Sequence, residues 1–308
     1  MIVFTYPGQG SQHPEMGSPW QDHPSWELVE EASEVAQIDL GRLLTDADAS
    51  ELRDTRNAQL ATFVLSMLIL DAVERLGVDA AGHAGHSLGE YSALAASGAL
   101  EFADAVTLVV ERGAAMGAAI EELPGTMAAV LGLDDEQVET ACQEAGDGVW
   151  VANYNAPGQV VVAGTSDAVK AAGQAARRLG AKKVTSLEVA GAFHTPLMAP
   201  ARDRLAGAID GTEIRTPEGT VVANVDATAH EAPETWRALM TAQLCSPVRW
   251  SQTLLTLGKL GFTTFVELGP GSVLSSLAKR TLPDSIRLGV AIPEHLDRLL
   301  GALAPGVP

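Results

Sequence analysis

Apolar residues recur with helical spacing in several long segments of the N-terminal part of the chain. In segment 57–76 the apolar positions share one helical face: Leu60, Phe63, Val64, Met67, Leu68 and Val73. This spacing predicts a helix buried on that face. Segments 24–37, 91–100 and 102–120 are also expected to be helical, and the last two are rich in alanine. Residues 2–6, IVFTY, instead predict a short buried strand that a Pro-Gly pair ends.

The pattern changes after Pro124-Gly125, where short apolar runs and helical segments follow the order β-α-β-β-α-β. The strands are expected at 126–133, 149–155, 159–165 and 182–189, and the helices at 134–145 and 166–180. Asp134 is expected to begin the first helix and Ser166 to cap the second. This order is the ferredoxin-like pattern, and it predicts a compact subdomain with its own sheet over residues 125–192.

Strands and helices alternate again after this insertion. Helices are expected at 196–209, 234–244, 252–261 and 273–280, and strands at 219–225 and at the start of 263–272. Such alternation predicts α/β layers around a mostly parallel sheet. The chain is therefore expected to hold a larger α/β subdomain, residues 1–124 and 193–308, interrupted by the ferredoxin-like one. The Pro/Gly-containing end 304–308 is expected to fray.

The composition of the chain limits which partners it can bind and where in the cell it is expected. The chain has 308 residues, 46% of them hydrophobic, which is enough for a large core. Its 20 Lys and Arg against 39 Asp and Glu give a formal charge of −19, and such a surface repels nucleic acid and anionic membrane. The longest apolar stretch, 61–70, is about half a membrane span, and the N-terminus lacks the basic start of a signal peptide. These features predict a soluble, cytoplasmic protein.

Metal and redox chemistry find no support in the sequence. The two cysteines, Cys142 and Cys245, are far apart and form neither a metal-ligand spacing nor a disulfide framework. The chain has no G-x-G-x-x-G fingerprint, and PGQGS lacks the Lys-Ser/Thr ending of a phosphate loop. We therefore expect no metal and no cofactor.

The pentapeptide GHSLG, residues 85–89, places Ser87 between two glycines. In a nucleophile elbow such glycines allow a sharp strand-to-helix turn that exposes the serine hydroxyl. The N–H groups at the start of the following helix would favour developing negative charge there. The alternative is an ordinary serine that caps the helix without any chemistry.

A nucleophilic serine needs a base, and the chain has seven histidines. His83 and His86 are too close to Ser87 along the turn to be the obvious base. His194 follows an expected strand and lies between a Gly-Ala turn and a proline, where the insertion returns to the larger subdomain. It is the best candidate, although its spacing alone leaves a packing role equally open.

Four segments together resemble the malonyl-CoA:acyl carrier protein transacylases, whose fold also forms the acyltransferase domains of fatty acid and polyketide synthases. They are PGQGSQ (7–12), GHSLGEYSAL (85–94), NAPGQVVVAG (155–164) and GAFHTPLM (191–198). Four further segments support the resemblance: VERG (110–113), NVD (224–226), QLCSPVRW (243–250) and ELGPGSVLSSLAKR (267–280). All occur in the family's order and span nearly the whole chain. The resemblance implies a hydrolase-like α/β subdomain with a ferredoxin-like insertion, as the patterning also predicts.

The resemblance implies a ping-pong acyl transfer from a coenzyme A thioester to an acyl carrier protein. Ser87 would form a malonyl ester, with His194 as general base and then general acid. The backbone N–H groups of Leu88 and Gln9 would form the oxyanion hole, each donor being worth ~3–4 kcal/mol. Gln243 would lie near His194 and orient it. The phosphopantetheine belongs to the carrier protein, and the enzyme is expected to be a monomer.

Arg112 would select the substrate class. In the family the arginine of this helix forms a fork with the free carboxylate of malonate, a bidentate contact that lysine cannot make. The alternative is a surface arginine paired with Glu111 or Asp104. Phe193, the bulky residue before the histidine, resembles the malonyl-selective pattern because it leaves no room for an α-methyl group. Such a pocket separates substrates by ~1–3 kcal/mol per methyl group.

The chain departs from the family pattern at two positions, and other functions remain open. Tyr6 replaces the usual phenylalanine, and Gly117 stands where many members have glutamine, which could widen the acyl pocket. Asn155 and Asn224 are expected to be structural. One rival is a Ser-His-Asp esterase or thioesterase with an acid such as Asp167, although Arg112 favours transfer. Others are a stand-alone polyketide-pathway acyltransferase with another acyl unit and a non-catalytic carrier-binding protein.

Overall fold

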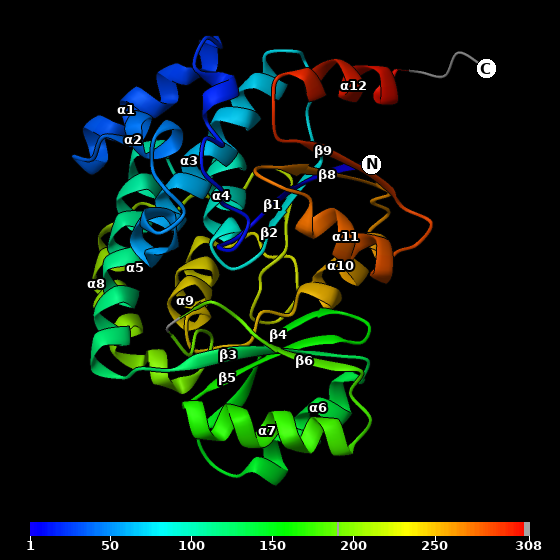
Figure 1. Ribbon diagram of the computed structural model, residues 1–308. Helices are drawn as coiled ribbons and strands as arrows, with labels where there is room; N and C mark the ends of the chain where they lie inside the picture. The colour runs from blue at the N-terminus through cyan, green and yellow to red at the C-terminus, as the bar shows by residue number, and fades with distance from the viewer. Residues whose placement is uncertain (190, 305–308) are drawn as a thin grey trace.

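Two separate β-sheets organise the computed structural model, which describes residues 1–189 and 191–304 (Figure 1). The larger sheet has the order β7-β2-β1-β8-β9, and all its strand pairs are parallel. Its strands are β1 Ile2–Tyr6, β2 Gly82–Gly85, β7 Thr220–Val221, β8 Thr264–Leu268 and β9 Ile286–Val290. The smaller sheet has the order β4-β5-β3-β6 and is antiparallel. Its strands are β3 Thr126–Leu131, β4 Val149–Ala156, β5 Gln159–Gly164 and β6 Lys183–Ser186.

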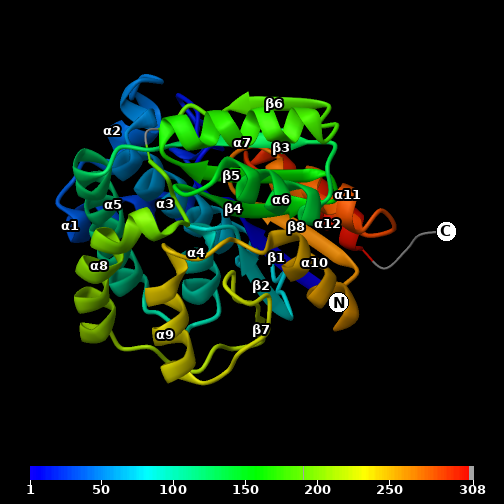
Figure 2. The ribbon, with the colours of Figure 1, turned by 90° about the horizontal axis from the view of Figure 1, so that it is seen from below.

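The helices cover both sheets. Those of the larger subdomain are α1 Glu27–Ala36, α2 Leu40–Thr45, α3 Thr55–Glu74, α4 Gly89–Ala96, α5 Phe102–Glu122, α8 Ala199–Gly211, α9 Pro233–Gln243, α10 Trp250–Lys259, α11 Val273–Thr281 and α12 Glu294–Leu303. The smaller subdomain carries α6 Asp135–Ala145 and α7 Ser166–Arg178. Figure 1 shows α3, α4 and α5 on one side of the parallel sheet and α10 and α11 on the other. Figure 2, seen from below, shows α6 and α7 over the outer face of the small sheet.

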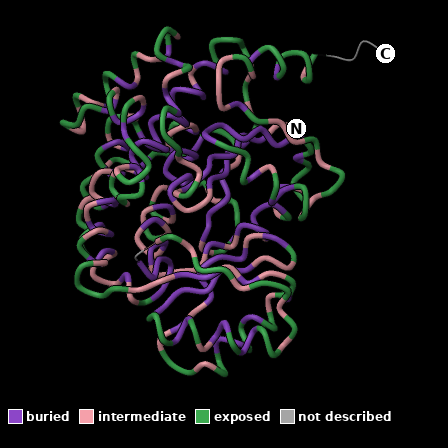
Figure 3. The backbone as a smooth tube through the Cα atoms, in the orientation of Figure 1, coloured by how far each residue is buried: buried purple, intermediate pink, exposed green. Residues whose placement is uncertain are grey.

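The central strand β1 explains how the two helical layers hold the parallel sheet. Phe4 and Tyr6 are fully buried in the core cluster that includes α3 and α5, whereas Val3 packs in a second cluster with Trp250 of α10 and Leu274 of α11. Successive side chains of a strand point to opposite faces, so a strand covered on both faces is mostly apolar, as β1 is. Figure 3 shows these central strands as buried, with the exposed backbone at the periphery.

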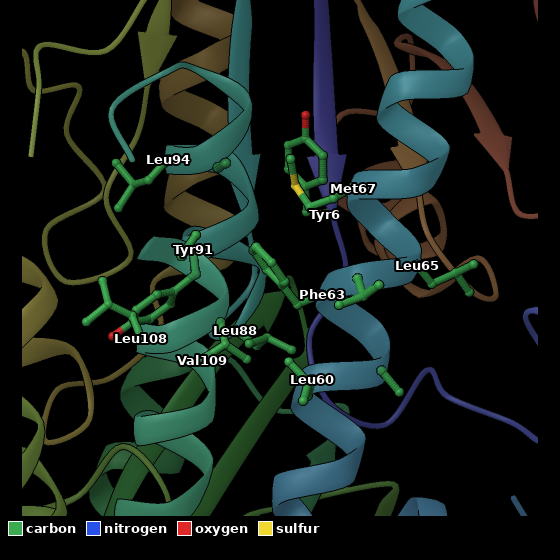
Figure 4. Packing of buried hydrophobic residues seen from close by; sticks show 14 of the residues in the cluster. Tyr6, Leu60, Phe63, Leu65, Met67, Leu88, Tyr91, Leu94, Leu108 and Val109 are labelled. Atoms are coloured by element: carbon green, nitrogen blue, oxygen red, sulfur yellow. The ribbon is translucent and has the colours of Figure 1, made fainter. Parts of the chain in front are cut away.

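Helix α3 is the core helix of the larger subdomain. Figure 4 shows Leu60 and Phe63 of α3 pointing toward Leu88 and Tyr91, at and near the start of α4. Within the described ranges, α3 is the one helix that is long and apolar enough to cross a membrane, yet 83% of its most apolar stretch is buried inside the protein. That degree of burial is what a core helix requires.

The ferredoxin-like prediction is confirmed. The segment from β3 to β6 has the order β-α-β-β-α-β, and its helices share a core with Val130, Val160 and other apolar strand residues. Asp134 caps α6 in a capping box with Gln137, as expected. The expected cap of α7 is wrong by one residue: Thr165 accepts the Ala168 N–H, because Thr165 still has extended backbone and Ser166 is already helical.

Most of the expected elements occur within a few residues of their expected bounds, with specific exceptions. The strand expected at 219–225 is shortened to β7, because the chain turns back in a bridge between Val222 and Ala229. Four elements of the structure were not expected from the sequence: β2, α2, β9 and α12. The subdomain division at 125 and 192 stays a prediction. Of the segment expected to fray, residues 305–308 lie outside the described residues.

Candidate functional site

Ser87 lies on a tight turn between β2 and α4. Its φ is 54°, in the left-handed region that non-glycine residues adopt at a cost. The two flanking glycines are sterically required: a Cβ at Gly85 would lie 1.8 Å from the carbonyl carbon of Gly89, and a Cβ at Gly89 would lie 2.1 Å from the carbonyl oxygen of Tyr6. The alternative of a capping serine is wrong, because Leu88 is the N-cap of α4 and no side chain caps it.

We predict that Gly85→Ala destabilises the protein by about 1–3 kcal/mol or more, because the added methyl group overlaps the backbone of the next turn. Gly207→Ala is the matched control. Gly207 lies in α8 with nothing within 4 Å of its missing Cβ, so alanine there should raise stability by about 0.5–1 kcal/mol. Urea unfolding of both variants measures the difference. Equal stabilities for the two variants would contradict the steric argument.

His194 contacts the Ser87 hydroxyl directly. Its Nε2 lies 2.8 Å from Ser87 Oγ, and its Nδ1 lies 3.0 Å from the backbone carbonyl oxygen of Gln243. A carbonyl oxygen only accepts, so Nδ1 carries the proton and Nε2 presents its lone pair to the serine. An alcohol in this position can give its proton to the imidazole. His194 also has a positive φ, 61°, so the backbone at both residues is held in a strained conformation.

The Gln243 carbonyl occupies the position that a carboxylate has in a Ser-His-Asp triad. Gln243 is the last residue of α9, and helix carbonyl ends carry a partial negative charge that favours an imidazolium. The arrangement expected for a hydrolase with Asp167 is wrong, since Asp167 lies exposed in the first turn of α7, in the smaller subdomain. The structure does place Gln243 beside His194, as expected from the sequence.

Burial keeps the His194 ring neutral. Desolvation, and secondarily the charge of Arg112, lower the pKa of His194 to about 3. We therefore predict that the ring stays neutral from pH 5 to pH 8 instead of titrating near its ordinary pKa of about 6.5. Ring ¹⁵N shifts, assigned with His194→Gln, measure the protonation state. An imidazolium signal that appears between pH 6 and pH 7 would contradict this prediction.

Arg112 reaches the same point from α5. Its side chain is only 1% exposed, and its Nη2 donates to Ser87 Oγ at 3.1 Å and to Gln243 Oε1 at 2.9 Å. Nη1 donates to Gln59 Oε1 at 2.6 Å, and the guanidinium lies 5.4 Å from the centre of the Tyr91 ring. The alternative of a surface arginine is therefore wrong.

The donors of Arg112 are not all occupied. Its buried Nε has no hydrogen-bond partner among the described residues. Glu111 was the partner expected if Arg112 lay on the surface. It pairs with Arg204 instead, with 3.3 Å between Glu111 Oε2 and Arg204 Nη2. A buried guanidinium with spare donors beside a serine hydroxyl can receive a carboxylate.

Free backbone donors also lie near Ser87. The Ser87 N–H donates to Asn224 Oδ1 at 2.7 Å, and Asn224 Nδ2 donates to the Gly85 carbonyl at 2.7 Å, so Asn224 holds the turn. No hydrogen-bond acceptor for the Leu88 N–H or the Gln9 N–H occurs within residues 1–189 and 191–304. Unpaired N–H groups of this kind are suited to bind a developing oxyanion.

A cavity of about 220 Å³ lies beside Ser87. Both subdomains line it: Ser87, Arg112 and His194 come from the larger one, and Met127 of β3 and Val161 of β5 come from the smaller one. Gln9 and Phe193 also line this cavity. A larger hollow of about 620 Å³ touches His194 from another side but contains neither Ser87 nor Arg112, so we assign substrate binding to the smaller cavity.

Two sequence departures have local explanations. The Tyr6 hydroxyl bonds with His83 Nδ1 at 2.9 Å, so the tyrosine has a buried polar partner that phenylalanine would lack. Gly117 does not line the 220 Å³ cavity. It lines a neighbouring pocket, where a Cβ on it would lie 2.9 Å from Arg56 Nε. Gly117 therefore does not widen the 220 Å³ cavity directly, and its effect on the range of acyl groups stays a prediction.

Sequence reasoning missed two residues that hold this site. Gln59 of α3 accepts from Arg112, and Glu90 of α4 lies fully buried behind Gln243. Glu90 is the one charged residue of segment 88–100, but the sequence does not reveal the partners that a buried carboxylate needs. The role of Gln59 has no signal in the sequence, because only the fold brings α3 beside α5.

Comparisons with known proteins agree with this geometry. The sequence pattern of the acyl transferase domain family matches residues 3–306. A malonyl CoA-acyl carrier protein transacylase of Bacillus subtilis is 40% identical over 307 residues, which cover 98% of this chain and 97% of that protein. An acyl carrier protein S-malonyltransferase of Vibrio cholerae superimposes with a TM-score of 0.93 at 37% identity and covers 97% and 99% of the two chains. A malonyl-transacylase solved in complex with the holo acyl carrier protein of a type II polyketide synthase gives a TM-score of 0.94 at 36% identity, with 98% and 99% covered.

Proposed function

The chain belongs to the acyl transferase family, and from this premise we propose that it transfers a malonyl group from malonyl-CoA to the phosphopantetheine thiol of an acyl carrier protein. One observation carries the proposal: Ser87 Oγ lies within hydrogen-bond distance of both His194 Nε2 and Arg112 Nη2. A nucleophile, its base and a cation for a carboxylate therefore meet in one cavity. The names of the relatives support this substrate and this partner.

In the first half-reaction the Ser87 hydroxyl attacks the thioester carbonyl of malonyl-CoA while His194 Nε2 takes its proton. The N–H groups of Leu88 and Gln9 stabilise the oxyanion of the tetrahedral intermediate. The carbon–sulfur bond then breaks, and the imidazolium returns its proton to the departing coenzyme A thiolate. The malonyl group remains as an ester on Ser87, and His194 is neutral again.

The second half-reaction runs the same steps in reverse with a different thiol. The phosphopantetheine thiol of the carrier protein enters the cavity and gives its proton to neutral His194. The thiolate attacks the ester, the oxyanion forms at the same N–H groups, and Ser87 leaves with the proton from the imidazolium. This ping-pong order needs only one cavity, because coenzyme A and the carrier protein each present their thiol on a pantetheine arm of the same structure.

Arg112 accounts for the choice of a dicarboxylic acyl group. A malonyl carboxylate can pair with the guanidinium in place of the Ser87 contact, which frees the hydroxyl to react. An acetyl group leaves the same guanidinium buried without an anion, and a buried unpaired charge is unfavourable. The cavity therefore favours malonyl over acetyl donors.

The direct test of the substrate class is a competition experiment. The protein is mixed with equal malonyl-CoA, methylmalonyl-CoA and acetyl-CoA, without an acceptor, and its intact mass is recorded. We expect a single malonyl adduct. A dominant acetyl or methylmalonyl adduct would overturn the proposed selectivity, and free malonate released without an adduct would indicate a hydrolase.

We predict that Phe193→Ala increases the methylmalonyl-to-malonyl ratio of acylation by about tenfold, because the ring otherwise fills the space that an α-methyl group needs. Phe193 is 6% exposed and lines the cavity. Phe262→Ala is the control, since Phe262 is also buried but lies in the core cluster with Trp250 of α10, away from this cavity. The same competition assay measures both variants. Equal ratios in the two variants would contradict the role of the ring.

A further inference from the structure

Glu90 is a buried carboxylate that the reaction scheme above does not use. It lies in the first turn of α4, is 0% exposed and faces the interior between α4 and α9. Its Oε2 accepts the backbone N–H of Asn224 at 2.5 Å, and its Oε1 accepts from Gln243 Nε2 at 3.0 Å. Burial raises the pKa of Glu90 to about 7, although these hydrogen bonds and the charge of Arg112 oppose the shift. A buried carboxylate with two such partners is costly to keep and needs a reason.

The partners of Glu90 determine which way the Gln243 amide points. The amide nitrogen of Gln243 faces Glu90 Oε1 at 3.0 Å, and the ionised form of the carboxylate, which only accepts hydrogen bonds, favours this orientation. The same nitrogen also donates to the Ser87 carbonyl oxygen at 2.9 Å. The amide oxygen is consequently turned the other way, toward Arg112 Nη2 at 2.9 Å. If the amide were reversed, the NH₂ group of Gln243 would face the Nη2 donor of Arg112, and two donors would lie opposite each other.

We propose that Glu90 is a positioning residue for malonyl recognition: it fixes the side-chain amide of Gln243, whose oxygen then holds the Arg112 guanidinium beside Ser87. This inference rests on the proposed function, because it concerns the same acyl group and the same arginine. Glu90 does not touch the acyl group. Its carboxylate acts through the two hydrogen bonds of one amide.

A simpler role for Glu90 would be that of a counter-charge, and the two roles predict opposite results. The charged and titratable groups around Glu90 are Arg112 from α5, Tyr91 from its own helix and Asp226 from the loop after β7. As a counter-charge alone, Glu90 would compete with the malonyl carboxylate for Arg112. Its removal would then increase the preference for malonyl groups. As a positioning residue, its removal lowers that preference.

The test variant is Glu90→Gln, which keeps the shape of the side chain but adds an amide donor. Glutamine has only one oxygen, so it cannot accept from both the Asn224 N–H and Gln243 Nε2 as the two carboxylate oxygens do, and the Gln243 amide reverses or loses its partner. Rate constants for Ser87 acylation by malonyl-CoA and by acetyl-CoA are measured separately by intact mass. We expect the malonyl-to-acetyl ratio to fall about tenfold or more, the size typical of losing a hydrogen bond to a charged group. An unchanged or increased ratio would overturn the proposal.

Glu267→Gln is the matched control for burying an amide in place of a carboxylate. Glu267 is 1% exposed and accepts two backbone N–H groups, from Leu274 and Ser275, at the start of α11. We expect this variant to lose stability in thermal unfolding while its malonyl-to-acetyl ratio stays within about twofold of the wild type. An equal fall in both variants would mean that the ratio reports general destabilisation, and it would overturn the positioning role.

A second variant keeps the test decisive if Glu90→Gln does not fold. Gln243→Ala removes the amide but keeps the backbone carbonyl that holds His194. We expect the malonyl-to-acetyl ratio of Gln243→Ala alone to fall. If Glu90→Gln also folds, combining the two changes should bring no further fall, because they break the same connection. An unchanged ratio in Gln243→Ala overturns the inference. The proposed function fails separately, if the wild-type protein itself forms no malonyl adduct.

Discussion

Replacing Ser87 with alanine is expected to lower malonyl transfer by about 10⁴- to 10⁶-fold, because the ester intermediate then cannot form. The oxyanion donors and the cavity remain, so a residual rate above the uncatalysed reaction is expected. His194→Ala should have an effect of similar size, and the double variant should be little worse than either single one, because the two residues act as a unit in the same step.

Ser92→Ala is the control for this substitution. Ser92 is buried on the same helix α4, and no partner for its hydroxyl occurs among the residues that the structure describes. Its removal should leave transfer within about twofold of the wild type, since the hydroxyl makes no hydrogen bond that would be lost. The measurement is steady-state transfer of labelled malonyl to a holo carrier protein. A Ser87→Ala variant that keeps more than about a hundredth of the activity would exclude the serine as nucleophile.

Arg112→Lys is expected to lower acylation by malonyl-CoA by about 100-fold while acylation by acetyl-CoA changes far less. Lysine keeps the charge, but its three N–H donors all radiate from one nitrogen. They cannot reproduce the separate contacts of Nη1 with Gln59 and of Nη2 with Gln243 and also offer a planar fork to a carboxylate, as the guanidinium can. The loss should therefore be specific for acyl groups that carry a free carboxylate.

Arg204→Lys provides the comparison for Arg112→Lys. Arg204 is half exposed and pairs with Glu111 on the surface, so its replacement should leave both acylation rates unchanged. Rapid quench and intact mass give the rates of adduct formation with malonyl-CoA and with acetyl-CoA. The malonyl-to-acetyl ratio is then compared between the two variants. A uniform fall with both donors in Arg112→Lys would mean that the arginine supports the site structurally and does not recognise the carboxylate.

Hydrophobic periodicity predicted the fold well where an element has one clear period. Strand β1, helix α3 and the six elements of the small subdomain all carry such a pattern. Strand β2 carries none, because its sequence is Gly-His-Ala-Gly. The glycines are needed for close packing: a Cβ at Gly82 would lie 2.7 Å from the Phe262 ring. The composition of β2 is therefore determined by close packing against elements that are distant in sequence, and no apolar pattern marks the strand.

The site was predictable where a residue acts through its own side chain in a local motif. Ser87, His194 and Arg112 stand in such motifs, and the structure brings their side chains together. The partner of His194 was harder to predict, because a backbone carbonyl has no signature in the sequence. Chain order suggested Asp167 for that place, but order along the chain does not encode distance. Residues such as Glu90 are recognised only when their buried partners are known.

In the proposed mechanism a malonyl ester on Ser87 is the intermediate whose acyl group the carrier protein receives. The direct test is to form the malonyl-enzyme, remove free coenzyme A and malonyl-CoA, add holo acyl carrier protein and follow both masses over time. We predict that the adduct disappears at the rate at which malonyl-carrier appears, and that Ser87→Ala forms neither. An adduct that persists while malonyl-carrier forms only in the presence of malonyl-CoA would contradict it.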